Sequence, residues 1–176
     1  MVDRLNRRQE FIILKLKTML KYIKEDTTTV FREIPDEITL AINISNCQNN
    51  CKGCHSSYLK MDIGEELTES VLDELISKND GITCVCFMGE GNDHKMLLQF
   101  ADHISETYKG LKVAVYSGRN DMDVDFKSHF DYVKIGEYRE DCGPLDSKTT
   151  NQRLYRFYRD KKNRIIMEDI TNRFWS

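Results

Sequence analysis

Three cysteines, Cys47, Cys51 and Cys54, lie close together in a polar loop. The segment that carries them runs from Ile42 to Tyr58 and reads I-N-I-S-N-C-Q-N-N-C-K-G-C-H-S-S-Y, so an apolar run comes directly before the loop. Thiolates are strong ligands of zinc and of iron-sulfur clusters, and the short C-x3-C-x2-C spacing lets three of them converge on one centre. The spacing therefore predicts a metal site here.

The number of cysteines limits the kind of metal site. A closed zinc site takes four protein ligands, and an electron-transfer 4Fe-4S cluster takes four cysteines, whereas three leave one iron open to a small chelating ligand. Two alternatives remain open. His55 could complete a Cys3His zinc site, although adjacent ligands strain a loop, and the thiols could be ordinary buried side chains, although a polar loop is a poor place for them.

Alternating strand and helix patterns position this loop. Residues 37–45 predict a strand that delivers the cysteines, because apolar residues alternate along them. Thr68 is a suitable N-cap for a helix to about Lys78, and Asp93 or Asn92 for a helix to about Tyr108. Further strands are predicted at residues 82–88, 111–116 and 132–135, with a short helical piece near 124–129. Residues 82–88 are apolar on both faces, so we expect helices to cover both sides of that strand.

This β-α-β order predicts parallel strands, hence an α/β sheet or a partial (β/α) barrel. Ligands of such folds bind at the carboxyl ends of the strands. In this sequence those ends carry the cysteine loop, Gly89-Glu90-Gly91, Ser117-Gly118-Arg119 and Gly136. Glycine lets a backbone approach a ligand closely, so we expect these segments to surround one site.

The two ends of the chain have a different character. Residues 4–24 predict a basic amphipathic helix, which docks a partner, lies on a membrane surface or packs on the domain itself. We therefore divide the chain into a helical extension, residues 1–29, and a main domain, residues 30–176. Residues 154–158 and 164–170 predict a C-terminal β-hairpin, and we expect Cys84 and Cys86 to lie in the core.

Composition narrows the functional classes. The chain has 176 residues, 40% of them hydrophobic, and a net charge of -3, which suits one globular domain. It contains no apolar run of transmembrane length and no signal-peptide pattern, so we expect a cytoplasmic protein without a membrane partner. The basic residues between Arg153 and Arg164 are interpreted as a solvated face, so no nucleic-acid partner is expected.

The sequence resembles the activating proteins of anaerobic ribonucleoside-triphosphate reductases, which are small enzymes of the radical S-adenosylmethionine (AdoMet) superfamily. The resemblance spans roughly residues 30–170 and is carried by I-T-L-A-I-N-I-S-N-C-Q-N-N-C-K-G-C-H-S, G-I-T-C-V-C-F-M-G, Y-S-G-R, D-Y-V-K-I-G-E-Y and G-P-L-D-S-K-T-T-N-Q-R-L-Y-R. It implies a radical AdoMet domain folded as a partial (β/α) barrel, here with an N-terminal helix and a C-terminal hairpin.

The resemblance also implies a role for particular residues. The three cysteines would hold one 4Fe-4S cluster, and the remaining positions would bind AdoMet. His55 would lie beside the nucleoside, and Gly89 with Glu90 would meet the methionine amino group through backbone oxygens. This chain has Met-Gly-Glu-Gly where many relatives have Gly-Gly-Glu-Pro. The further AdoMet-binding positions would be Ser117, Gly118, Lys134 and Gly136.

The activity implied is reductive cleavage of AdoMet at the cluster, followed by abstraction of a hydrogen atom from a glycine of the large reductase subunit. The implied partners are that large subunit and an electron donor such as a flavodoxin-type protein, and a homodimer is left open. Two other functions remain as alternatives. One is a radical AdoMet enzyme that acts on a small molecule, and the other is a non-catalytic zinc-binding interaction module.

Overall fold

The computed structural model describes residues 19–49 and 51–175. Its strands are β1 (Lys21–Tyr22), β2 (Thr28–Val30), β3 (Thr39–Asn43), β4 (Glu65–Glu66), β5 (Cys84–Met88), β6 (Lys112–Tyr116), β7 (Tyr132–Ile135), β8 (Arg153–Arg159) and β9 (Ile165–Asp169). Its α-helices are α2 (Glu69–Ser77), α3 (His94–Thr107) and α4 (Val124–Lys127), and its 3-10 turns are η1 (Lys24–Asp26), η2 (Ser57–Lys60) and η3 (Thr171–Phe174). The predicted strands, helices and hairpin are confirmed to within two residues for most of their ends.

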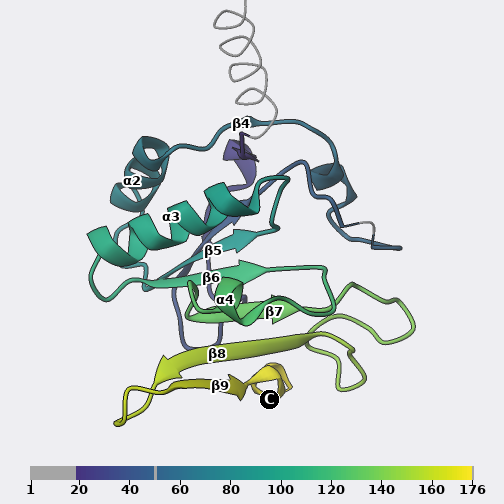
Figure 1. The fold of residues 1–176 in the computed structure, drawn as a ribbon. Coiled ribbons are helices and arrows are strands. Elements are labelled where there is room, and N and C mark those ends of the chain that lie inside the picture. Colours follow the sequence, from purple (N-terminus) through teal and green to yellow (C-terminus); the bar gives the residue numbers. More distant parts are fainter. Residues whose placement is uncertain (1–18, 50, 176) are drawn as a thin grey trace, which may run out of the picture.

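One sheet of seven strands organises the described residues, in the order β2-β3-β5-β6-β7-β8-β9 (Figure 1). Strands β3, β5, β6 and β7 are parallel, while β2, β8 and β9 each run antiparallel to a neighbour. Each parallel strand lies beside the preceding one, so every crossover advances in the same direction. Right-handed crossovers that all advance one way place their helices on one face, where α2, α3 and α4 lie.

The two longer helices begin where the sequence predicts. Thr68 accepts a hydrogen bond from the backbone N–H of Val71, and Asp93 accepts one from the N–H of Met96. Each side chain thereby satisfies one of the unpaired N–H groups in the first turn. The helices are held in place by packing, because α2 buries Leu72 and Ile76 beneath it.

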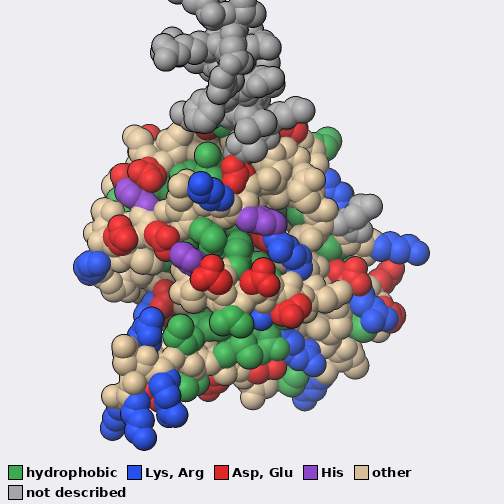
Figure 2. All heavy atoms as spheres, in the orientation of Figure 1, with side chains coloured by type: hydrophobic (Ala, Val, Ile, Leu, Met, Phe, Trp, Pro, Cys, Tyr) green, Lys and Arg blue, Asp and Glu red, His purple; other side chains and the backbone are tan. Residues whose placement is uncertain are grey.

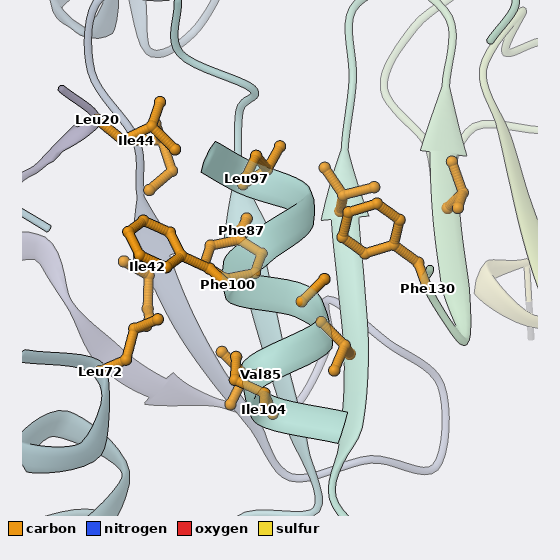
Figure 3. Packing of buried hydrophobic residues seen from close by; sticks show 14 of the residues in the cluster. Leu20, Ile42, Ile44, Leu72, Val85, Phe87, Leu97, Phe100, Ile104 and Phe130 are labelled. Atoms are coloured by element: carbon orange, nitrogen blue, oxygen red, sulfur yellow. The ribbon is translucent and has the colours of Figure 1, made fainter. Parts of the chain in front are cut away.

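The main core fills the space between the helices and the sheet (Figure 3). Phe100 and Ile104 of α3 pack with Val85 and Phe87 of β5, and all four side chains are at least 95% buried. Burying a large apolar side chain contributes about 1.5 to 3 kcal/mol, so this layer fixes the strands whose ends carry the site.

The opposite face of the sheet corrects one expectation. We expected helices on both sides of residues 82–88, but Cys84 and Cys86 pack in a second cluster to which no described α-helix contributes. The segment around Ile34 and the chain after β9, including Ile170, cover that face instead. An apolar pattern on both faces of a strand predicts that both faces are buried, but it does not predict which segments cover them. The placement of Cys84 and Cys86 in the core is confirmed, since both are fully buried.

The predicted helix over residues 4–24 is wrong at its C-terminal end. Residues 1–18 lie outside the described part, but Lys21–Tyr22 is a strand that pairs antiparallel with β4, and Lys24–Asp26 is a 3-10 turn. Leu20 and Tyr22 are buried in the main core, so tertiary packing overrides the helical pattern here. The division of the chain at residue 29 stays a prediction.

The described chain is thus a mixed α/β fold with a sheet at its centre, with β2 and β9 as the edge strands. Among residues 19–49 and 51–175, no helix has the length and apolar character needed to cross a membrane.

Candidate metal centre

The carboxyl ends of the four parallel strands surround one cavity of about 730 Å³. The cysteine loop follows β3, Gly89 follows β5, and Ser117-Gly118 follows β6, so neighbouring strands deliver these segments to the same edge of the sheet. The cavity is lined by eight of the ten residues that the sequence proposes for the site, namely Cys47, Cys51, Cys54, His55, Gly89, Ser117, Gly118 and Lys134.

Hydrogen bonds to backbone carbonyls hold the cysteine loop against the segment that follows it. The N–H of Cys47 donates to the Leu59 carbonyl at 2.9 Å, and the Lys60 ammonium donates to the Cys51 carbonyl at 3.2 Å. Asn46 begins the loop with a φ of 56°, and Gly53 has a φ of 77° just before the third cysteine. Glycine adopts this left-handed conformation without strain, which suits position 53.

The three thiols line the same cavity, but they are not yet close enough together to bind a single metal ion. All three are free and half-buried. In the described part of the chain, no three side chains of His, Cys, Asp or Glu stand close enough to hold a metal ion as they are. Burial raises the pKa of the Cys47 thiol, and the neighbouring Cys51 and Cys54 raise it further. A bound cation reverses this effect, because it stabilises the thiolate form.

Glycine at position 118 lets the backbone pass directly beside one of these thiols. A Cβ atom at Gly118 would lie 2.8 Å from Cys51 Sγ and 3.1 Å from the Cβ of Asn49. A Cβ at Gly89, which has a φ of 117°, would lie 3.2 Å from the Ile44 carbonyl oxygen. The cavity thus contains three free thiols, and its walls approach so closely because the residues at these two positions are glycines. This arrangement fits an iron-sulfur cluster with a small ligand beside it.

Lys134 brings a buried amine to the same cavity. Its ammonium donates to the Gly136 carbonyl at 2.8 Å and to the Ser117 carbonyl at 3.3 Å. Burial lowers the pKa of Lys134 from its usual 10.5 to about 8, while electrostatic interactions with Cys51 and Cys54 act in the opposite direction. A buried cation beside potential thiolates favours anionic ligands in this cavity.

Replacing Lys134 with methionine is expected to stabilise the metal-free protein at neutral pH. Keeping this side chain charged costs about 3 kcal/mol, and losing its two hydrogen bonds costs the variant about 1 to 2 kcal/mol. The cost of the charge is fully present below pH 8 and is lost as the pH rises through 10.5. Urea unfolding at about pH 7 and about pH 10 should therefore show a gain that shrinks at the higher pH. An equal effect at both would contradict this assignment.

Glu90 does not line the cavity, and its side chain binds the next loop. The residue is 1% exposed, and its carboxylate accepts a hydrogen bond from the Ser117 hydroxyl, while Arg119 Nη2 lies 2.5 Å from Glu90 Oε2. His94 Nε2 lies 3.1 Å from the same carboxylate. Burial lowers the pKa of His94, and the Arg119 charge adds to that effect. Glu90 therefore ties the loop after β5 to the loop after β6.

Replacing Glu90 with alanine is expected to destabilise the protein by roughly 2 to 4 kcal/mol. The change leaves the Ser117 hydroxyl and Arg119 without their buried acceptor, and breaking a buried ion pair is costly. Arg119 is 35% exposed and can turn to water, which limits the effect. Thermal unfolding measures it. Asp141→Ala, which removes the exposed partner of Arg139, is the control and should change little. Equal effects of the two changes would refute the role assigned to Glu90.

The second residue outside the lining is Gly136. Its carbonyl accepts from the Lys134 ammonium and from the Gln152 side chain at 3.1 Å, and a Cβ at this position would lie 2.9 Å from Gln152 Cα. Gly136 therefore helps to hold the Lys134 ammonium in place through its carbonyl. The AdoMet-binding roles of both Glu90 and Gly136, like those of the lining residues, stay predictions.

Tyr138 is a cavity residue that the sequence does not single out. Its ring packs on His55 with centroids 4.5 Å apart, and a Cβ at Gly53 would lie 3.6 Å from it. The segment after β7 therefore rests directly on the cysteine loop. The only sequence signal was its place in the D-Y-V-K-I-G-E-Y motif, because an aromatic residue in a loop does not by itself indicate what it contacts.

Comparison with known proteins agrees with this geometry. Among curated proteins and solved structures, none matches the chain at a significant level. One protein family does match, over residues 38–162, which is about seven tenths of the sequence and includes all three cysteines and every other cavity residue discussed above. The match supports a 4Fe-4S cluster as the group that the cysteine loop holds. The chain belongs to the family of 4Fe-4S single cluster domains.

Proposed function

We propose that this protein is a radical AdoMet enzyme that activates a glycyl-radical enzyme. In this proposal it cleaves AdoMet reductively and removes a hydrogen atom from a glycine of the large subunit of an anaerobic ribonucleotide reductase. The observation that carries the proposal is the cavity itself. Three free thiols, and no fourth cysteine of the described residues, face a space of about 730 Å³ together with a buried lysine and glycine-bearing strand ends.

The fold supports the proposal. Parallel strands that advance in one direction, with their helices on one face, are the arrangement from which (β/α) barrels are built. A partial barrel of the radical AdoMet type would place the second cluster of buried residues, around Cys86 and Tyr132, on its inner face. The cavity would then lie at its carboxyl-terminal mouth, where barrel enzymes bind their ligands.

Different residues of this chain have different proposed roles. Cys47, Cys51 and Cys54 would hold the cluster, which supplies an open iron for AdoMet and the electron that cleaves it. Lys134 offers a buried positive charge to a carboxylate. Gly89 and Gly118 let backbone approach the ligand, and the surrounding walls exclude water from the reacting groups.

The His55 and Tyr138 rings form the part of the cavity wall that we assign to the nucleoside, since the two tilted rings offer an aromatic surface to it. The proposed substrate is a protein, of which one segment enters the cavity. Phe31, which is 71% exposed, lies in the lining and offers an apolar contact to an entering segment. A flavodoxin-type protein is the proposed electron donor.

The proposal is tested by mixing the reconstituted protein anaerobically with AdoMet, a strong reductant and the large reductase subunit from the same source. The expected result is 5'-deoxyadenosine together with a glycyl radical on the large subunit, detected by electron paramagnetic resonance. A fully loaded and reduced protein that does not cleave AdoMet would rule out the enzyme activity.

A radical AdoMet enzyme with a small-molecule substrate is the second candidate, because a cavity of about 730 Å³ lies within the range of small-ligand sites. Deoxyadenosine formed without a radical on the reductase, at several ratios of the two proteins, would favour this candidate. Stoichiometric zinc in place of iron would instead favour an interaction module.

A further inference from the structure

Strand β9 presents an open edge at the end of the seven-stranded sheet. It pairs with β8 on one side, and no strand among residues 19–49 and 51–175 pairs with its other side. Open edges readily pair with another chain, and proteins usually protect them with proline, a bulge or charged side chains, especially lysine. β9 contains no proline or lysine and pairs with β8 without a bulge, and its first three residues, Ile165, Ile166 and Met167, are apolar, although Glu168 and Asp169 follow them.

The direction of the backbone groups along β9 follows from two hydrogen bonds. Asp160 N–H donates to the Arg164 carbonyl at 3.0 Å, and Ile170 N–H donates to the Leu154 carbonyl at 2.9 Å. Since bonding direction alternates along an antiparallel ladder, Ile166 also faces β8. The N–H and C=O groups of Ile165 and Met167 therefore point outward, and their side chains are 46% and 54% exposed.

The charges along this edge are opposite at its two ends. Arg164 precedes the three apolar residues and Glu168 follows them, so each lies two positions from Ile166 in the sequence. Arg164 also pairs with Asp160 at 2.7 Å, inside the hairpin whose basic tip is visible in Figure 2. When a second copy of β9 lies antiparallel to the first, the basic end of each strand meets the acidic end of the other.

We propose that β9 is the interface of a homodimer in which two copies of the strand pair antiparallel about Ile166. In this register Ile165 of one copy exchanges both backbone hydrogen bonds with Met167 of the other, and Arg164 lies opposite Glu168. The twofold arrangement repeats each pair, as an interface between identical surfaces requires. Cross-strand apolar and charged pairs both stabilise such a ladder. The two sheets then form one continuous sheet of fourteen strands.

Analytical ultracentrifugation of the full chain, from about 1 to about 200 µM, tests the proposal. Wild type is expected to shift from monomer to dimer as its concentration rises. In a dimer of Arg164→Glu, both 164–168 pairs between the copies consist of two glutamates, and in a dimer of Glu168→Arg both consist of two arginines. Like charges repel, so each variant alone should stay monomeric. Mixing the two variants restores both attractive pairs and should restore a dimer.

Lys161→Glu is the matched control, because it makes the same charge change outside the paired residues and should leave the dimer intact. Circular dichroism confirms that each variant is folded, and the mixture remains informative even where Arg164→Glu weakens the hairpin. A wild type that is monomeric over the whole range overturns the proposal, as do dimers that persist in both single variants. A mixture that stays monomeric overturns the antiparallel register.

Discussion

Replacing Cys51 with alanine is expected to reduce the iron content of the anaerobically reconstituted protein from about four atoms per chain to a small fraction of that. The 5'-deoxyadenosine product should disappear with it. The reason is that only three thiols face the cavity, so the loss of one leaves two, and no other described cysteine lies in the lining to replace it. Cys47→Ala and Cys54→Ala should behave in the same way. Iron and sulfide analysis measures the effect.

Cys86→Ala is the matched control for these three variants. Cys86 is fully buried on the opposite face of the sheet from the helices, where its sulfur lies 3.6 Å from Met88 Sδ, so its loss should lower stability and spare the iron. If Cys51→Ala retained the iron of the wild type, the assignment of the cysteine loop would be wrong.

Replacing Gly118 with alanine is expected to impair cluster loading although every proposed ligand is still present. The added Cβ would lie 2.8 Å from Cys51 Sγ, closer than such atoms approach, and at a tight 3.1 Å from the Cβ of Asn49, so the thiol must move. Overpacking of this kind typically costs about 1 to 3 kcal/mol. Here the displaced atom is a ligand, so we expect low iron content in a protein that still folds, measured by iron analysis and circular dichroism.

Gly81→Ala provides the comparison. Gly81 has a φ of 82°, which disfavours alanine, but a Cβ there would meet nothing within 4 Å. It should therefore cost some stability without affecting iron. Equal iron contents in the two variants would show that contact with Cys51 does not matter.

Much of the fold was predictable because its signals are local. Thr68 and Asp93 cap α2 and α3 as expected, since an N-cap needs only a side-chain oxygen and the backbone just after it. Parallel strands then bring their carboxyl ends to one edge. From that rule, residues up to about 90 positions apart in the sequence, such as Cys47 and Lys134, were predicted to surround one site, and both line the cavity.

The failures concern contacts that only the folded chain defines. Residues 21–22 pair with β4, and no periodicity in the sequence predicts that partner. The same applies to the segments that cover the face containing Cys86. Glu90 lies next to a cavity residue, yet its side chain turns to Ser117 and Arg119 because a buried carboxylate requires hydrogen-bond donors. Sequence patterns therefore located the site and left its supporting contacts undetermined.

The central claim is that three cysteines hold a 4Fe-4S cluster with one iron open to AdoMet. It is tested most directly by electron paramagnetic resonance of the reduced, reconstituted protein before and after AdoMet is added, alongside iron, sulfide and zinc analysis. We expect about four iron and four sulfide per chain, a paramagnetic reduced cluster, and a change in its signal on adding AdoMet. Stoichiometric zinc, or a cluster signal that AdoMet leaves unchanged, would contradict the claim.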